Sequence, residues 1–313
     1  MFKSNLEISI LIPTYNASHL WLEVLESVER QSITSLKKVI IDSGSTDDTV
    51  ILAKQHGFQV VQIDKSEFNH GKTRQQLADF VGNTDIAVFL TQDAVLESPD
   101  SIQNIVSAFD DPEIGMAYGR QLPRKNAEPL EIHARMFNYP EISDIRSYND
   151  KDRLGFKVFF CSNSFSAYRL SALNAVGGFP SDSIMGEDAI VAAKMLLKKF
   201  KLAYLANATV YHSHNYTLKE EFKRYFDTRV FHEQNKWLIN EYGKPTGEGF
   251  KFVKSEISYA IKQHKTSLFK SVGSIFAKWL GYNMAKYYKK MPVTILRKLS
   301  MHQFYWKTSK TNE

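Results

Sequence analysis

The stretch Ile86-Ala87-Val88-Phe89-Leu90-Thr91-Gln92-Asp93-Ala94 joins five apolar residues directly to a polar tip that carries one carboxylate. A short apolar run that ends in polar residues is typical of a buried strand in an α/β sheet. Ligands of such sheets bind beyond the carboxyl ends of the strands, so we expect Asp93 at the mouth of a cleft. A carboxylate there can hold a divalent metal ion, which can in turn hold a diphosphate. Asp93 could instead cap the helix that is predicted to begin near Ser98.

Strand-like and helix-like segments alternate along the first part of the chain. Strands are predicted at residues 8–12, 38–42, 58–63 and 86–90, and helices at residues 20–28, 51–56 and 72–80. Strands separated by helices at this rhythm predict a parallel sheet that is wound by right-handed crossovers.

Two predicted loops at the mouth of this sheet carry groups that suit a nucleoside. A carboxylate accepts hydrogen bonds from a pyrimidine base or from ribose hydroxyls, and small residues let the backbone come close. Both loops could also be ordinary turns, because Asn, Gly, Ser and Asp form turns. No G-x-G-x-x-G or G-x-x-x-x-G-K-[ST] motif occurs, which disfavours a dinucleotide site and excludes a P-loop. The groups belong to Thr14, Tyr15 and Asn16 in one loop and to Asp42, Ser43 and Gly44 in the other.

Four motifs in this chain resemble those of the inverting family 2 glycosyltransferases of GT-A fold. They are Ile12 to Ala17, Asp42 to Thr49, Asp93 at a strand end, and Gly186-Glu187-Asp188, and they cover roughly residues 7–215 in the family's order. The resemblance implies a Rossmann-like, mostly parallel central sheet that is flanked by helices. It also implies a catalytic domain over residues 1–215, with a nucleotide-binding half at about 1–121 and an acceptor half at about 122–215.

Three further segments resemble the bacterial rhamnosyltransferase branch of that family: Phe68 to Arg74, Thr91 to Ala94, and Val210 to Tyr216. That branch transfers L-rhamnose from dTDP-β-L-rhamnose to a growing surface polysaccharide, usually carried on a polyprenyl diphosphate lipid. The resemblance implies this reaction and adds Arg74 and Gln92 to the donor-binding residues. A family 2 transferase that uses a UDP-hexose is one alternative. A non-catalytic module that binds a glycan or a nucleotide is another.

The expected metal motif departs from the family pattern. The family usually has Asp-x-Asp, whereas this chain has Thr91-Gln92-Asp93, so only one carboxylate remains. Either His212 or His214 could complete a site for Mn²⁺ or Mg²⁺, and imidazole suits Mn²⁺ better. A lone histidine is nevertheless more often structural.

The acceptor side of the resemblance rests on two short segments. Ser162 and Asn163 resemble the part of the family that lines the acceptor pocket. Asp188 resembles the family's general base, with Glu187 as the alternative, and attack opposite the leaving diphosphate would invert the anomeric centre. Both carboxylates open a predicted helix, so they could also be simple caps.

A polar segment, residues 143–153, is expected to form a mobile loop after the nucleotide-binding half. Water at the anomeric carbon would hydrolyse the donor, so glycosyl transfer needs a site that excludes it. The segment could be a lid that serves this purpose or a plain surface connection.

Charge is unevenly distributed along the chain, whose net charge is +6. Residues 250–313 hold 13 Lys and Arg against 2 Asp and Glu, a net charge of +11, while the other residues hold 27 against 32, a net charge of −5. Such asymmetry indicates an anionic partner for the basic region. The acidic remainder and the absence of a recognised nucleic-acid motif favour a membrane surface over nucleic acid.

Residues 216–313 are expected to form a basic, aromatic-rich helical extension. Between Leu268 and Leu280 the apolar residues form one stripe at helical spacing, with Lys270 and Lys278 off it, as in helices that lie in a membrane interface. Packing on the catalytic domain or on a second subunit of a homo-oligomer is the alternative.

The expected location is cytoplasmic, at the inner face of the cell membrane. The N-terminal residues do not resemble a signal peptide, and no apolar run reaches 18 residues. The one cysteine, Cys161, fits a reducing compartment and lies in an apolar run, so we expect it in the core.

Overall fold

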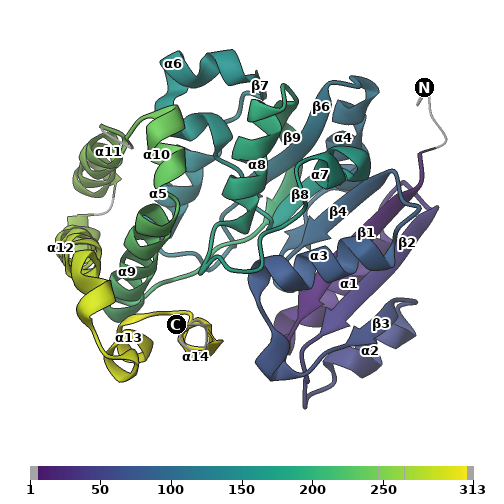
Figure 1. The fold of residues 1–313 in the computed structure, drawn as a ribbon, viewed down its shortest axis with the longest axis horizontal. Coiled ribbons are helices and arrows are strands. Elements are labelled where there is room, and N and C mark those ends of the chain that lie inside the picture. The colour runs from purple at the N-terminus through teal and green to yellow at the C-terminus, as the bar shows by residue number, and fades with distance from the viewer. Residues whose placement is uncertain (1–5, 245–246, 264, 309–313) are drawn as a thin grey trace. The chain divides into compact units, whose positions relative to one another are not determined.

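The structure is a computed structural model that describes residues 6–244, 247–263 and 265–308 (Figure 1). Two compact units are present in it. The first comprises Met1–Arg124, Tyr139–Ser181 and Glu187–His212, and the second comprises Lys125–Asn138, Asp182–Gly186 and Ser213–Glu313, as far as these ranges are described.

The first unit is built on a nine-stranded sheet, counted over the described residues, with the order β3-β2-β1-β4-β8-β6-β9-β5 and with β7 paired to β9. The strands are β1 Ile8–Thr14, β2 Leu36–Asp42, β3 Gln59–Gln62, β4 Ile86–Leu90, β5 Val95–Leu96, β6 Ile114–Leu122, β7 Asp144–Arg146, β8 Phe165–Arg169 and β9 Lys201–Tyr211.

The pairing directions change along this sheet. Strand β1 pairs in parallel with β2 and β4, and β2 pairs in parallel with β3, as the rhythm of the sequence predicts. Strand β8 is antiparallel to both β4 and β6, while β6 and β9 are parallel. The expected α/β fold is confirmed, but the sheet is mixed rather than mostly parallel. The antiparallel pairs join strands that are distant in sequence, which a local βα pattern cannot reveal.

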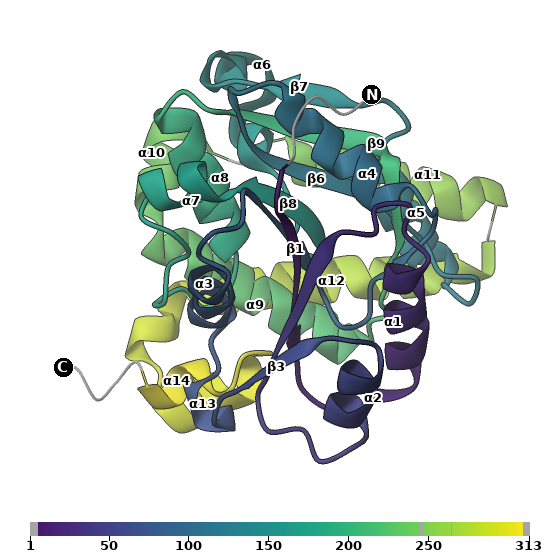
Figure 2. The same cartoon turned by 90° about the vertical axis from the view of Figure 1, so that its right-hand side faces the viewer.

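Helices cover both faces of the sheet (Figure 2). Alternate residues of β1, namely Ile8, Ile10 and Ile12, belong to the core beneath α1, α2 and α4, because side chains along a strand point to opposite faces in turn. Helices α3, α7 and α8 lie on the other face. The helices of this unit are α1 Trp21–Glu29, α2 Thr49–Gln55, α3 His70–Phe80, α4 Ser101–Val106, α6 Lys151–Leu154, α7 Leu170–Ala175 and α8 Glu187–Leu197.

The segment 143–153 is not the loop that the sequence predicts. It forms β7, which pairs with β9, and the short helix α6. The guanidinium of Arg146 is buried and donates to the carbonyls of Lys157 (3.1 Å) and Phe160 (3.0 Å) and to the hydroxyl of Tyr118. The polar composition of the segment predicted a loop. These partners of Arg146 lie outside the segment, so its local sequence could not reveal this ordered structure.

The second unit is helical in its described part, which confirms the predicted C-terminal helical region. Its helices are α5 Pro129–Asn138, α9 Leu218–Gln234, α10 Lys236–Tyr242, α11 Glu248–Gln263, α12 Leu268–Met284, α13 Val293–Leu299 and α14 Tyr305–Thr308. None of the helices in the described residues combines the length and the apolar character needed to cross a membrane.

Candidate active site

The loops that follow β1, β2 and β4 meet at one edge of the sheet, because these parallel strands end there. Thr14 and Asp42 are register partners at the ends of β1 and β2. The side chain of Gln92, just after β4, accepts from the backbone N–H of Tyr15 (2.7 Å) and donates to the carbonyl of Tyr15 (3.1 Å). The sequence-predicted donor loops are therefore adjacent in the first unit.

Asp42 organises the loop after β2. Its carboxylate is fully buried and accepts from the backbone N–H groups of Gly44 (3.1 Å) and Ser45 (2.9 Å). It also accepts from the hydroxyls of Ser45 (2.5 Å) and Thr14 (3.1 Å). Gly44 has a φ of 82°, a conformation that glycine adopts without steric cost. Ser43 is buried beside this carboxylate.

Asn16 and Tyr15 extend the same surface from the loop after β1. The side-chain carbonyl of Asn16 accepts from the backbone N–H of Thr46 (2.9 Å), which ties the first two loops together. The ring of Tyr15 lies 4.0 Å from the ammonium group of Lys65, which also donates to its hydroxyl. An aromatic ring with a cation beside it suits a nucleotide, and sequence reasoning missed Lys65.

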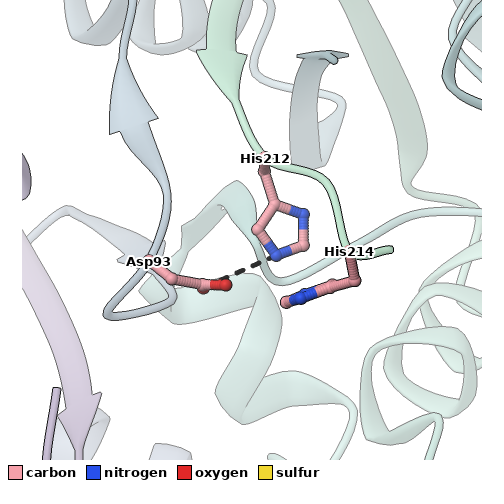
Figure 3. A group of neighbouring side chains, drawn as sticks. All are labelled: Asp93, His212 and His214. Carbon is pink, nitrogen blue, oxygen red and sulfur yellow. Dashed lines mark ion pairs between the residues drawn. The ribbon is translucent and has the colours of Figure 1, made fainter. Parts of the chain in front are cut away.

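Asp93 lies among groups that carry or can carry positive charge. One carboxylate oxygen is 3.5 Å from the guanidinium of Arg124, and the other is 3.5 Å from Nε2 of His212. His214 follows two residues later, and Asp93, His212 and His214 each offer one ligand atom within 4.8 Å of the others (Figure 3). The Asp93 side chain keeps 22% exposure, so a ligand can reach it.

The tautomer of His212 is set by Gln121. Nδ1 of His212 lies 2.9 Å from the side-chain oxygen of Gln121, whose amide nitrogen donates to Ser162 Oγ (2.9 Å). An acceptor at Nδ1 selects the ring with its proton there, which directs the lone pair of Nε2 toward Asp93. One carboxylate oxygen and two imidazole nitrogens fit Mn²⁺ better than Mg²⁺.

A second acidic centre forms where α8 begins. The guanidinium of Arg74, from α3, lies 3.0 Å from a carboxylate oxygen of Glu187, and their side chains are only 6% and 9% exposed. Close approach of α3 depends on Gly71, because a Cβ at that position would lie 1.8 Å from the carbonyl oxygen of Pro180. Arg74, predicted from the sequence to bind the nucleotide, is thus engaged with Glu187.

Asp188 is held by backbone groups and by a like charge. Its carboxylate accepts from the N–H of Asn163 (3.1 Å) and from that of Ala189 (2.8 Å). Burial and the neighbouring charge of Glu187 raise the pKa of Asp188 to about 7. Burial acts to raise the pKa of Glu187 too, but Arg74, His70 and the hydrogen bond from Asn163 together outweigh it, and the net shift is downward. Carboxylates whose pKa values are pushed apart in this way can serve as base and fixed anion.

Asn163 uses its polar groups inside the protein. Its side-chain nitrogen donates to Glu187 (3.1 Å), and its side-chain oxygen accepts from the hydroxyls of Ser166 (2.8 Å) and Tyr168 (2.6 Å). Together with its backbone N–H, it therefore orients both Glu187 and Asp188.

A continuous path connects the two acidic centres. From Asp93 it runs through His212 and Gln121 to Ser162, whose chain neighbour donates its N–H to Asp188. Asp93 and Asp188, distant in sequence, are thus linked through side chains and, at the last step, through the backbone of Asn163.

Comparison with known proteins identifies the family of the chain. The family described as Glycosyl transferase family 2 matches residues 9–177. The chain belongs to this family. This glycosyltransferase is 45% identical over 302 residues, 96% of each chain, to the O-antigen chain rhamnosyltransferase RfbN of Salmonella typhimurium. It is 44% identical over 299 residues, 95% of each chain, to the O-antigen chain rhamnosyltransferase WbaN of Salmonella anatum.

A solved structure shows the same fold at low sequence identity. The mannosyltransferase PcManGT of Pyrobaculum calidifontis, in complex with GDP-Man and Mn²⁺, matches 99% of the glycosyltransferase and 89% of its own chain. The TM-score is 0.58 and the identity is 15%. The expected fold, family and enzyme class are therefore confirmed.

Two residues of this glycosyltransferase escaped sequence reasoning although a signal existed. Gln121 is a polar residue inside the mostly apolar run of β6, and such a residue needs a buried partner. Arg124 follows shortly after the end of β6. Polar residues just after β1, β2 and β4 were predicted to bind the donor, and Arg124 has the same kind of position.

Proposed function

We propose that this glycosyltransferase moves L-rhamnose from dTDP-β-L-rhamnose to a hydroxyl of a glycan acceptor in bacterial surface polysaccharide synthesis. The observation that carries the proposal is the 45% identity to an O-antigen chain rhamnosyltransferase over 96% of both chains. Because the similarity extends over almost the full length of both chains, a shared reaction is the simplest account.

We assign the role of general base to Asp188. A carboxylate with a pKa of about 7 can take the proton of the acceptor hydroxyl at neutral pH as the new C–O bond forms. The bond from the anomeric carbon to the diphosphate breaks on the opposite face, so the β-linked donor gives an α-linked rhamnoside. Glu187 is the weaker candidate, because its ion pair with Arg74 keeps it ionised and occupied.

The donor nucleotide is assigned to the edge formed by the loops after β1, β2 and β4. Tyr15 and Asn16 offer an aromatic ring and amide groups, and Gln92 holds the first and third loops together. Arg74 is assigned to positioning Glu187 rather than to the nucleotide.

Asp93, His212 and His214 would hold a divalent cation, for which their oxygen and nitrogen atoms favour Mn²⁺ over Mg²⁺. When bound, such a cation would offset the charge of the leaving diphosphate. Arg124 adds a permanent positive charge beside Asp93 that supports the same anion.

The acceptor is proposed to be carried on a polyprenyl diphosphate lipid, and the enzyme to act in the cytoplasm at the inner face of the cell membrane. The net charge of +11 over residues 250–313 supports contact with an anionic surface.

A donor competition assay tests the proposed reaction. The full chain is incubated with a synthetic lipid-linked acceptor and with dTDP-rhamnose, UDP-glucose or UDP-N-acetylglucosamine, and the products are analysed by mass and linkage. We expect transfer from dTDP-rhamnose alone, with an α linkage. Faster transfer from a UDP-sugar would identify the hexosyltransferase alternative. Nucleotide binding without transfer from any donor would identify a binding module.

A further inference from the structure

Helix α12 packs through its small residues and exposes its large apolar ones. Residues three or four positions apart share a face of a helix, and these two sets fall on opposite sides of α12. The buried set is Ser271, Ser274, Ala277 and Gly281, and the exposed set is Phe269 (89% exposed), Val272 (56%), Phe276 (60%) and Trp279 (59%).

Contacts within the second unit fix this orientation. A Cβ at Gly281 would lie 2.2 Å from the carbonyl oxygen of Phe222, so α12 lies directly against α9, and the two helices run side by side in Figure 2. Ser271 donates to the buried carboxylate of Glu256 on α11 (2.7 Å). Turning the aromatic side inward would break both contacts, so this apolar face stays exposed.

The lysines of α12 itself are used inside the unit. Lys278 lies 3.4 Å from Glu221 and 3.8 Å from Glu256, and Lys270 pairs with Glu128. Exposed lysines flank the helix in the sequence: Lys262 and Lys265 before it, and Lys286, Lys289 and Lys290 after it. No acidic residue occurs between positions 257 and 312.

We propose that the apolar face of α12, formed by Phe269, Val272, Phe276 and Trp279, inserts into the surface of a membrane that contains anionic lipids. A helix of this kind lies in the plane of the interface with its apolar face among the acyl chains. The lysines beyond its ends then reach the anionic headgroups. The inference rests on the proposed function, in which a lipid-linked acceptor is met at the membrane surface.

Charge argues for lipid over a second copy of this chain. A two-fold contact through α12 would bring the lysines at one end of the helix close to those of the partner helix, with no acidic residue between positions 257 and 312 to offset them. An anionic bilayer instead attracts each of these lysines electrostatically.

Vesicle flotation tests the proposal. The full chain is mixed with vesicles of phosphatidylethanolamine and phosphatidylglycerol, or of phosphatidylcholine alone, without donor or acceptor. We expect wild-type protein to float with the anionic vesicles. The double variant Phe276→Ser/Trp279→Ser should lose binding by about tenfold for each aromatic residue. Ile51→Ser, which removes an equally exposed apolar side chain from α2 of the first unit, should bind as wild type does.

A charge variant separates the contribution of the lysines from that of the apolar face of α12. Replacing Lys286, Lys289 and Lys290 with Gln should weaken binding to anionic vesicles by about fivefold per lysine and leave the phosphatidylcholine result unchanged. Circular dichroism should show the same melting temperature for all variants, because the substituted side chains are exposed.

Three results would overturn the proposal. The first is equal flotation of wild type and the aromatic double variant, and the second is no flotation of wild type. The third is a dimer in sedimentation velocity that the double variant abolishes, which would assign the face to a second copy. Because the vesicles hold neither donor nor acceptor, these results do not depend on the transfer reaction. A failure of the proposed function appears only in the donor assay.

Discussion

Asp93 and Asp188 are two carboxylates of one unit with opposite surroundings. Asp93 is approached by Arg124 and His212 through side chains, and its own side chain remains partly exposed. Asp188 accepts hydrogen bonds from two backbone N–H groups, and burial together with the charge of the neighbouring Glu187 raises its pKa to about 7.

These different surroundings suit Asp93 to binding a cation and Asp188 to transferring a proton. Arg124 places a fixed positive charge beside Asp93, and the neighbouring imidazole offers a second ligand atom for a cation. A like charge and burial make Asp188 give up and take a proton near neutral pH. Each centre can therefore be tested by substitutions that leave the other centre unchanged.

The largest effect is expected at the base. Asp188→Asn keeps the shape of the side chain but cannot accept a proton, so the transfer rate should fall roughly 10²-fold or more. Donor affinity, measured by calorimetry, should stay unchanged. Asp182→Asn, in an exposed residue shortly before α8, serves as the control and should keep full activity. Near-normal turnover of Asp188→Asn would remove the base from this position.

The next effect concerns the other centre. Asp93→Asn removes the carboxylate that faces both histidines, and the affinity for Mn²⁺ should fall by about 100-fold, as measured by electron paramagnetic resonance. Asp100→Asn, an exposed residue further along the same connection, should leave that affinity intact. If Asp93→Asn binds Mn²⁺ as tightly as wild type, the cluster is not a metal site.

Gln121→Leu tests the path between the two centres. The variant removes the acceptor at Nδ1 of His212, so the ring is no longer held in one tautomer and Mn²⁺ affinity should fall by about tenfold. The melting temperature of the variant provides the control for folding. An unchanged Mn²⁺ affinity in a folded variant would show that Gln121 does not orient the histidine.

The smallest effect is a shift along the pH axis. For wild type, kcat/KM should fall about tenfold per pH unit below about 7, because Asp188 must be deprotonated to act. In Glu187→Gln the like charge is gone and the pKa of Asp188 falls, so this acid limb should move to lower pH by about one unit. Glu141→Gln, at an 82% exposed side chain, should leave the limb in place. A limb that moves to higher pH would contradict the assigned electrostatics.

Local patterns predicted the elements of the first unit well and their partners poorly. The apolar run 86–90 before Asp93 forms β4, and the segment 72–80 lies within α3, as expected. The ion pair of Arg74 with Glu187 was missed because it joins helices that are distant in sequence. The segment 143–153 was misjudged for the same reason, since the partners of Arg146 are not its neighbours in sequence.

The stripe on α12 shows how a correct pattern can leave its use undecided. The sequence predicts an amphipathic helix whose apolar stripe lies in a membrane interface, or alternatively packs on the catalytic domain or on a second subunit. Only the contacts of Gly281 and Ser271 reveal that the small side is buried.

The sequence by itself determined the alternation of strands and helices, the family, and which residues carry acidic groups at strand and helix ends. These follow from the spacing of apolar and polar residues, which acts over a few neighbours. The tertiary structure alone decided which carboxylate is paired with a cation and which beside another carboxylate. It also decided which side of α12 is buried. These depend on contacts between segments far apart in the chain, where burial and charge are set by partners that no local pattern encodes.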